Sequence, residues 1–198
     1  MQTTKMIKPI TAFCIAAFLC MAIWSCDQKE ATAAVIDTNI SNDSLIKRGA
    51  YLVTIAGCDD CHSPKMMGPR GPELIPELRL SGYQAGNKLP PVNTEAISAG
   101  WALMNPDLTA AAGVWGTSYA ANLTSDETGI GNWTEAQFMK ALKEGKWKGM
   151  DGNRMLMPPM PWQNLSRMDD HDLRSIFAFL KSTRPVKNVV PNSIPAGQ

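Results

Sequence analysis

The sequence predicts an all-α domain with about three main helices and a long irregular insertion rich in glycine and proline. Three stretches carry apolar residues at the spacing of one helix face, and each begins with a polar residue suited to a helix cap. The alternation of apolar and polar residues that marks a half-buried strand is scarce. A chain of 198 residues with this pattern indicates one helical core of modest size.

The first predicted helix covers residues 44–57, SLIKRGAYLVTIAG. We expect Ser44 to cap its start, because a serine hydroxyl can accept from an N–H group of the first turn. We expect Gly57 to end it, because glycine adopts the left-handed conformation that closes a helix at low cost.

The second and third predicted helices follow the insertion. The second begins at Thr134, where Gln137 three residues later completes a capping box, and it ends at Gly145. The third covers DDHDLRSIFAFLKS, with Asp169 as its cap, and stops before Pro185. Both have their apolar residues on one side, so both are expected to pack against the first helix.

The start of the chain has the pattern of an export signal. Lys5 and Lys8 precede an apolar run that reaches Ser25 and is too short and too weakly apolar for a membrane span. The sequence IWSC at the end of this run resembles a bacterial lipobox. It implies that residues 1–25 are a lipoprotein-type signal peptide and that Cys26 is lipidated; ordinary cleavage nearby and an uncleaved anchor are the alternatives.

The rest of the chain divides by composition. Residues 26–43 are small and polar and predict a flexible tether, residues 44–187 predict the folded domain, and residues 188–198 predict an extended tail. The formal net charge of +1 gives no basic field for nucleic acid. Residues 63–132 are too long for a structureless loop in a compact domain, so we expect a large buried cofactor to organise them.

The motif GCDDCHSPK places Cys58 and Cys61 three residues apart, with His62 directly after the second cysteine. A zinc site needs a second pair of ligands, a redox dithiol usually accompanies alternating strands and helices, and a structural disulfide leaves His62 unexplained. Haem attachment uses all three residues, as two thioethers and one axial ligand. The sequence therefore predicts one covalent haem c on Cys58 and Cys61, with His62 on the iron.

The other axial position has several candidates. Met155, Met157 and Met160 lie in a proline-stiffened loop, NRMLMPPMPWQNL, before the third helix. His171 is the only other histidine, but its place in the first turn of a helix among acids predicts exposure. We expect one methionine of the loop to bind the iron and the others to pack against the cofactor or the core.

Four stretches together resemble one family. They are RGAYLVTIAGCDDCHSPK, WGTSYAANLTSDETGIGNWTEAQFMKALKEG, MPPMPWQNL and DLRSIFAFLKSTRPVKNVVP. They resemble the class I cytochromes c, and more closely bacterial monohaem domains related to cytochrome subunits of membrane-bound dehydrogenases. The resemblance runs from about Leu45 to Pro191, and it implies a class I cytochrome c fold around one haem.

The resemblance also implies roles for single residues. The axial methionine in the family pattern is the one before Pro-Trp, which is Met160 here. Trp115, Asn122 and Trp162 become candidates for the wall of the haem pocket, where an indole or amide could donate to a propionate. Gly49 would let the first and last helices cross closely.

The expected function follows from an iron with both faces filled by His62 and Met160, since no position is left for a substrate. We expect an electron carrier on the periplasmic side, anchored to the membrane through Cys26. Its expected partners are redox proteins, either a dehydrogenase or a terminal oxidase, and not nucleic acid. The alternative function is a haem enzyme or a gas or redox sensor with a labile methionine ligand. Separately, Met157 could replace Met160 on the iron if the loop turns differently.

Overall fold

The computed structural model describes residues 41–197. The predicted signal peptide, Cys26 and most of the predicted tether lie outside the described residues. In chain order the elements are α2 (Asn42–Ile55), α3 (Cys58–His62), β1 (Lys65–Gly68), β2 (Gly71–Leu74), η1 (Pro76–Leu78), α4 (Thr94–Ser98), β3 (Leu103–Met104), β4 (Ala110–Gly113), β5 (Gly116–Tyr119), α5 (Glu135–Glu144), η2 (Trp147–Gly149), α6 (Trp162–Leu165), α7 (Asp170–Ser182) and β6 (Ile194–Pro195).

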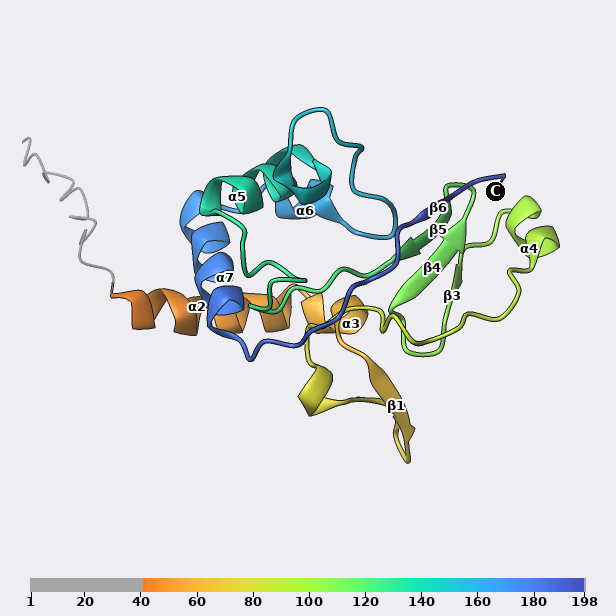
Figure 1. Ribbon diagram of the computed structural model, residues 1–198, viewed down its shortest axis with the longest axis horizontal. Coiled ribbons are helices and arrows are strands. Elements are labelled where there is room, and N and C mark those ends of the chain that lie inside the picture. The colour runs from red at the N-terminus through yellow and green to blue at the C-terminus, as the bar shows by residue number, and fades with distance from the viewer. Residues whose placement is uncertain (1–40, 198) are drawn as a thin grey trace, which may run out of the picture. The chain divides into compact units, whose positions relative to one another are not determined.

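Helices α2 and α7 cross closely at Gly49 (Figure 1). A Cβ atom on Gly49 would lie 2.7 Å from the Cβ atom of Phe179, so only glycine allows this approach. The predicted role of Gly49 is confirmed. The helices enclose a core of buried apolar side chains: Leu52, Val53, Leu80, Ile130, Phe138, Leu142, Leu173, Ile176 and Leu180.

The predicted helix ends are mostly confirmed. Thr134 and Gln137 form the capping box at the start of α5, and Gly145 ends α5 with a φ of 67°. Asp169 stands at the N-cap of α7. The start of α2 differs, because Ser41 rather than Ser44 is its cap, and the Ser41 hydroxyl accepts from the Ser44 N–H at 3.2 Å.

The prediction of an all-α, class I cytochrome c fold is wrong. Of the described residues, 36% are helical and 14% lie in strands, which form two antiparallel sheets. One sheet is the β1–β2 hairpin and the other has the strand order β3-β4-β5-β6. The fold is therefore mixed α/β, and the irregular insertion predicted for residues 63–132 contains five of the six strands.

The sequence hides these strands for two reasons. β4 is Ala-Ala-Ala-Gly with all four residues buried, so it shows no alternation of apolar and polar residues. β6 comes from the predicted tail and pairs with β5, with Thr117 opposite Ile194. Such a pairing depends on residues about 80 positions apart, which a local pattern cannot report.

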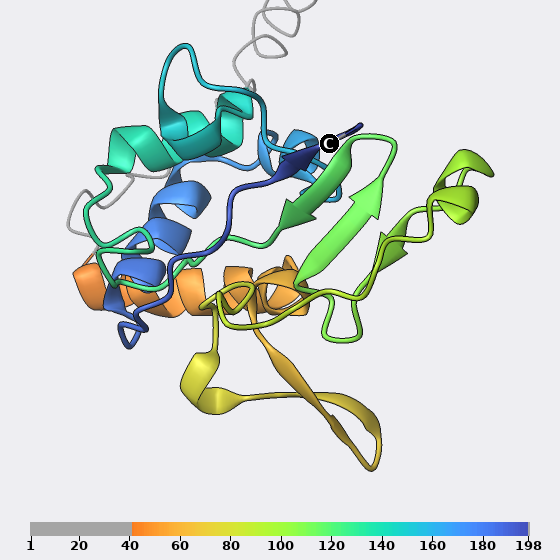
Figure 2. The same ribbon diagram turned by 45° about the vertical axis from the view of Figure 1, so that its right-hand side comes forward.

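The sheets lie beside the helices (Figure 2). The β1–β2 hairpin extends away from them in both views, and its Met66 and Met67 side chains are exposed. The segment between α5 and α6 forms a loop at the top of both views. No helix within residues 41–197 is long and apolar enough to cross a membrane.

Candidate functional site

Helix α3 presents the cysteines and the histidine of the motif in little more than one turn. Gly57, with a φ of 67°, takes the left-handed conformation that turns the chain out of α2 and into α3. Cys58 and Cys61 are three residues apart and therefore point to the same side of α3. Both are half-buried, and neither forms a disulfide.

The two thiols are poor candidates for a redox dithiol. Burial, followed by the neighbouring Asp59 carboxylate, raises the pKa of the Cys58 thiol to about 11. Burial also raises the pKa of Cys61, with Asp60 as the next cause. Reactive cysteines need a lowered pKa, because the thiolate is the nucleophile. These cysteines are protonated at neutral pH, which argues against disulfide exchange in the folded protein.

His62 is buried and its orientation is set by the backbone. Its Nδ1 donates a hydrogen bond to the carbonyl oxygen of Ala121 at 2.8 Å, since a carbonyl can only accept. In this tautomer Nε2 carries the lone pair. Burial lowers the pKa of His62 and keeps the ring neutral. A neutral imidazole with Nδ1–H bound to a carbonyl is the arrangement that metal-binding histidines adopt.

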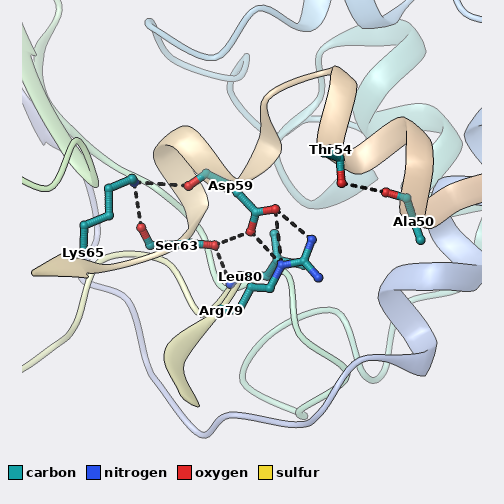
Figure 3. A network of polar contacts seen from close by, with 7 residues as sticks. All are labelled: Ala50, Thr54, Asp59, Ser63, Lys65, Arg79 and Leu80. Carbon is teal, nitrogen blue, oxygen red and sulfur yellow. Dashed lines mark hydrogen bonds and ion pairs between the residues drawn. The ribbon is translucent and has the colours of Figure 1, made fainter. Parts of the chain in front are cut away.

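A polar network holds α3 against the chain that follows it (Figure 3). Arg79 donates to both carboxylate oxygens of Asp59, from Nε at 3.0 Å and from Nη2 at 2.8 Å. The Ser63 hydroxyl donates to Asp59 at 2.6 Å and accepts from the Leu80 N–H at 2.8 Å. Burial opposes ionisation of Asp59, but the hydrogen bonds from Arg79 and Ser63 outweigh it and lower the pKa of Asp59.

Lys65 closes the C-terminal end of α3. The three N–H groups of its ammonium are shared among four carbonyl oxygens, those of Asp59, Asp60 and Ser63 at 2.7 to 3.2 Å and that of Asp107 at 3.1 Å. A cation is favourable there because the last carbonyls of a helix are unpaired and partly negative. Lys65 therefore ties the motif helix to the loop before β4.

The methionine loop meets the same apolar core as the motif. Met160 and Cys58 are both partly buried, and both pack against the core cluster of the α2, α5 and α7 helices. Met160 lies in a turn in which its N–H donates to the Met157 carbonyl at 3.2 Å. Ser118 on β5 donates to the Pro158 carbonyl at 2.6 Å and fixes the loop from the side of the sheet.

The other axial candidates differ in how far they are buried. Met155 is 42% exposed. The side chain of His171 is half exposed on the first turn of α7, with Nδ1 3.7 Å from a carboxylate oxygen of Asp172. The predicted exposure of His171 is therefore confirmed. Met157 is partly buried, so burial alone does not separate it from Met160.

The three residues predicted for the pocket wall have different surroundings. Trp115 lies in the turn between β4 and β5, and within residues 41–197 its indole N–H is the buried side-chain donor without an acceptor. The amide nitrogen of Asn122 is already bound, with the Val186 carbonyl at 2.8 Å as one acceptor. Trp162 is the first residue of α6, and its ring packs over Gly145 at the end of α5. Their role towards a cofactor stays a prediction.

Several residues of the site were not found from the sequence. Ala121 acts through its carbonyl, which no side-chain pattern can reveal, and it lies 59 residues from His62. Asp59, Lys65 and Arg79 could have been suspected, because charged residues inside and just after the motif need partners when they are half-buried. Their pairing depends on the fold.

The fold and the site thus define a mixed α/β domain with a Cys-x-x-Cys-His helix, an oriented neutral histidine and a methionine loop against one core. No family model matches the chain.

Comparison with curated proteins finds, among others, cytochrome subunits of three dehydrogenases. The cytochrome c subunit of gluconate 2-dehydrogenase from Pantoea cypripedii is 29% identical over 156 residues, or 78% of this chain and 26% of that protein. The cytochrome c subunit of the quinone alcohol dehydrogenase from Gluconobacter oxydans is 28% identical over 148 residues, or 74% and 23%. The cytochrome subunit of fructose dehydrogenase from Gluconobacter japonicus is 29% identical over 150 residues, or 75% and 23%.

The homologues of this chain are therefore cytochrome c subunits of dehydrogenases. The chain spans about a quarter of the length of these relatives.

Proposed function

We propose that this chain is a monohaem c-type cytochrome that carries electrons between redox partners outside the cytoplasmic membrane. Cys58 and Cys61 would hold the haem through thioethers, and His62 would bind the iron through Nε2. The bound haem would supply a one-electron couple. The observation that carries the proposal is the His62 tautomer, since the Nδ1 hydrogen bond to Ala121 leaves Nε2 as the ligand atom.

The residues present fit this cofactor. Two thiols three residues apart on α3 match the two thioether bonds, and the sequence contains one such motif, which supports a single haem. The buried indole N–H of Trp115 has no acceptor within residues 41–197, which leaves it available to a propionate. The homologous cytochrome c subunits support the same cofactor.

The attachment can be tested directly on purified exported protein. We expect its intact mass to include one haem and the haem to stay on the chain in a denaturing gel. Cys58→Ser should leave one thioether and shift the reduced spectrum, because one vinyl group then stays conjugated. Release of all haem on denaturation would reject covalent attachment.

Met160 is our proposed second axial ligand. The Met160→Ala variant should lose the weak long-wavelength band of a methionine–iron bond, lower the reduction potential and open the iron to carbon monoxide. Met157→Ala is the matched control in the same loop and should change none of these. Loss of the band in Met157→Ala alone would assign the ligand to Met157, and carbon monoxide binding by the unaltered protein would favour the sensor or enzyme alternative.

The proposed location is the periplasmic side of the membrane, with lipidated Cys26 as the anchor. More than one acyl chain is needed for stable attachment, and a diacylglyceryl cysteine supplies it. Mass spectrometry should find Cys26 as an acylated N-terminus. A mature chain that begins elsewhere would contradict the anchor without affecting haem attachment. The proposed electron donor is a dehydrogenase, on the strength of the homologues.

A further inference from the structure

Lys65 is a half-buried cation whose surroundings are main-chain carbonyls rather than carboxylates. The ion pairs within residues 41–197 do not include Lys65. Moving a charge out of water is unfavourable unless polar groups of the protein replace the water. Because the groups that replace it here belong to the backbone of two separate segments, the Lys65 ammonium joins those segments.

The first segment carries His62. It consists of α3 and Ser63, and Figure 3 shows the bonds from Lys65 to Asp59 and to Ser63. Ser63 follows His62 directly in the chain and is fully buried. The carbonyl of His62 itself accepts from the Gly82 N–H at 2.8 Å. The main chain of His62 and of the residue after it is therefore fixed by hydrogen bonds.

The second segment is the turn before β4, which the Asp107 side chain organises. Its Oδ1 accepts from the Asn105 amide at 2.6 Å, from the Thr109 N–H at 3.1 Å and from the Thr109 hydroxyl at 2.7 Å. Thr109 is 1% exposed. The Asp107 carbonyl accepts from Lys65 at 3.1 Å, so Lys65 bonds to a turn that is already rigid.

This turn leads back to the acceptor of the His62 ring. The Thr109 carbonyl accepts from the Ala120 N–H at 2.8 Å, and the carbonyl of the next residue, Ala121, accepts from His62 Nδ1 at 2.8 Å. The bonds close a ring whose members in order are His62, Ala121, Ala120, Thr109, Asp107, Lys65 and Ser63. Lys65 is the member that bonds to both segments, so removing its ammonium opens the ring between them.

We propose that Lys65 is a positioning residue for His62, which holds the imidazole against the Ala121 carbonyl by closing this ring of hydrogen bonds. The proposal rests on the proposed function, because it treats His62 as a ligand whose orientation matters. A partner at Nδ1 fixes the tautomer and the orientation of a ligating imidazole, and that partner is effective only if it is itself held in place. Bonds from a charged donor are stronger than neutral ones, which suits Lys65 to this task.

Hydrogen exchange in the reduced holoprotein, measured by NMR, tests the ring. The test variant is Lys65→Met, which keeps an unbranched side chain and removes the ammonium. Its matched control is Lys88→Met, the same change at an exposed lysine. We expect the His62 Nδ1–H and the Ala120 N–H to exchange at least about tenfold faster in the test variant, because the charge-assisted bonds are lost. The control should stay within about twofold of the parent.

Two comparisons separate positioning from a general loss of stability. The Val53 N–H lies in α2 with its side chain fully buried, so its exchange reports opening of the core. Exchange at Val53 should increase less in Lys65→Met than exchange at His62 does. Lys65→Arg keeps a cation with several donors and should return exchange at His62 to within about threefold of the parent.

A second variant tests the ring at a member that carries no charge. Thr109→Val keeps the volume of a buried side chain and removes the hydroxyl that donates to Asp107. It should speed exchange of the His62 Nδ1–H by about threefold, less than Lys65→Met, because the Thr109 N–H still donates to the same oxygen. This variant decides the question if Lys65→Met does not fold.

Two results would overturn the proposal. One is exchange at His62 that is the same in Lys65→Met, or failing that in Thr109→Val, as in the Lys88→Met control. The other is an increase at His62 no larger than the increase at Val53, which would make Lys65 a general contributor to stability. A protein that carries no haem would end the proposed function, but exchange of the Ala120 N–H would still decide whether Lys65 closes the ring.

Discussion

Gly49→Ala should destabilise the protein through the crossing of α2 and α7. The new Cβ atom would lie 2.6 Å from the Ser175 carbonyl carbon and 2.7 Å from the Phe179 Cβ atom, and the Ser175 oxygen would be closer still. Ordinary contacts are 3.4 Å or more. Because both neighbours belong to the framework of α7 rather than to the end of a flexible side chain, the two helices must move apart by at least about 1 Å.

Two effects of opposite sign set the magnitude. A gap of that size removes a quarter to a half of the contact energy along the crossing, and such overpacking costs about 1 to 3 kcal/mol or more. Alanine favours a helix interior over glycine by about 1 kcal/mol, which offsets part of the loss. We expect a net loss of about 1 to 2 kcal/mol in the free energy of unfolding, or roughly 2 to 8 °C in Tm for a chain of this size.

Thermal unfolding of the holoprotein, followed by circular dichroism, measures this loss. Gly86→Ala is the matched control, since no atom lies within 4 Å of a Cβ atom at Gly86 and its φ is not positive. The control should keep the parental Tm or exceed it slightly, because alanine restricts the unfolded chain. If Gly49→Ala melted with or above the parent, the close crossing would be refuted.

Three further outcomes follow from the described residues. Hydrogen bonds from Arg48 hold the pKa of Asp172 below its usual value of 3.8, so the stability from this carboxylate is present above that value and is lost as the pH falls through the lowered pKa. Measured by urea unfolding, the free energy of unfolding should therefore fall more between about pH 6 and pH 3 for the parent than for Asp172→Asn. Equal falls would show that the Arg48–Asp172 pair does not contribute to stability. Thr134→Ala removes the capping box of α5 and should cost about 1 kcal/mol in urea unfolding, whereas Thr134→Ser should keep most of it. Trp115→Phe removes a buried indole donor and should shift the reduction potential of the holoprotein. An unchanged potential would show that the Trp115 indole does not interact with the cofactor.

The sequence by itself determined the features that depend on neighbouring residues. The capping box of Thr134, the left-handed ends at Gly57 and Gly145, and the spacing of Cys58, Cys61 and His62 are local. A cap or a helical turn is formed by groups three or four residues apart, so the sequence contains all of its partners. The helices and the motif were therefore predictable, while the choice of cap within a serine-rich start, Ser41 instead of Ser44, was not.

Only the tertiary structure decided the features that join distant parts of the chain. The strands of the larger sheet are two to four residues long, and β4 holds only alanine and glycine, so their pairing rests on backbone hydrogen bonds that no side-chain pattern records. The orientation of His62 depends on the Ala121 carbonyl, and the hold on α3 depends on Arg79, 20 residues from Asp59. Ordering such distant groups costs chain entropy that only the assembled core offsets. The tautomer of His62 is therefore a property of the fold. The spacing between His62 and Cys61 is a property of the sequence, because the two residues are adjacent.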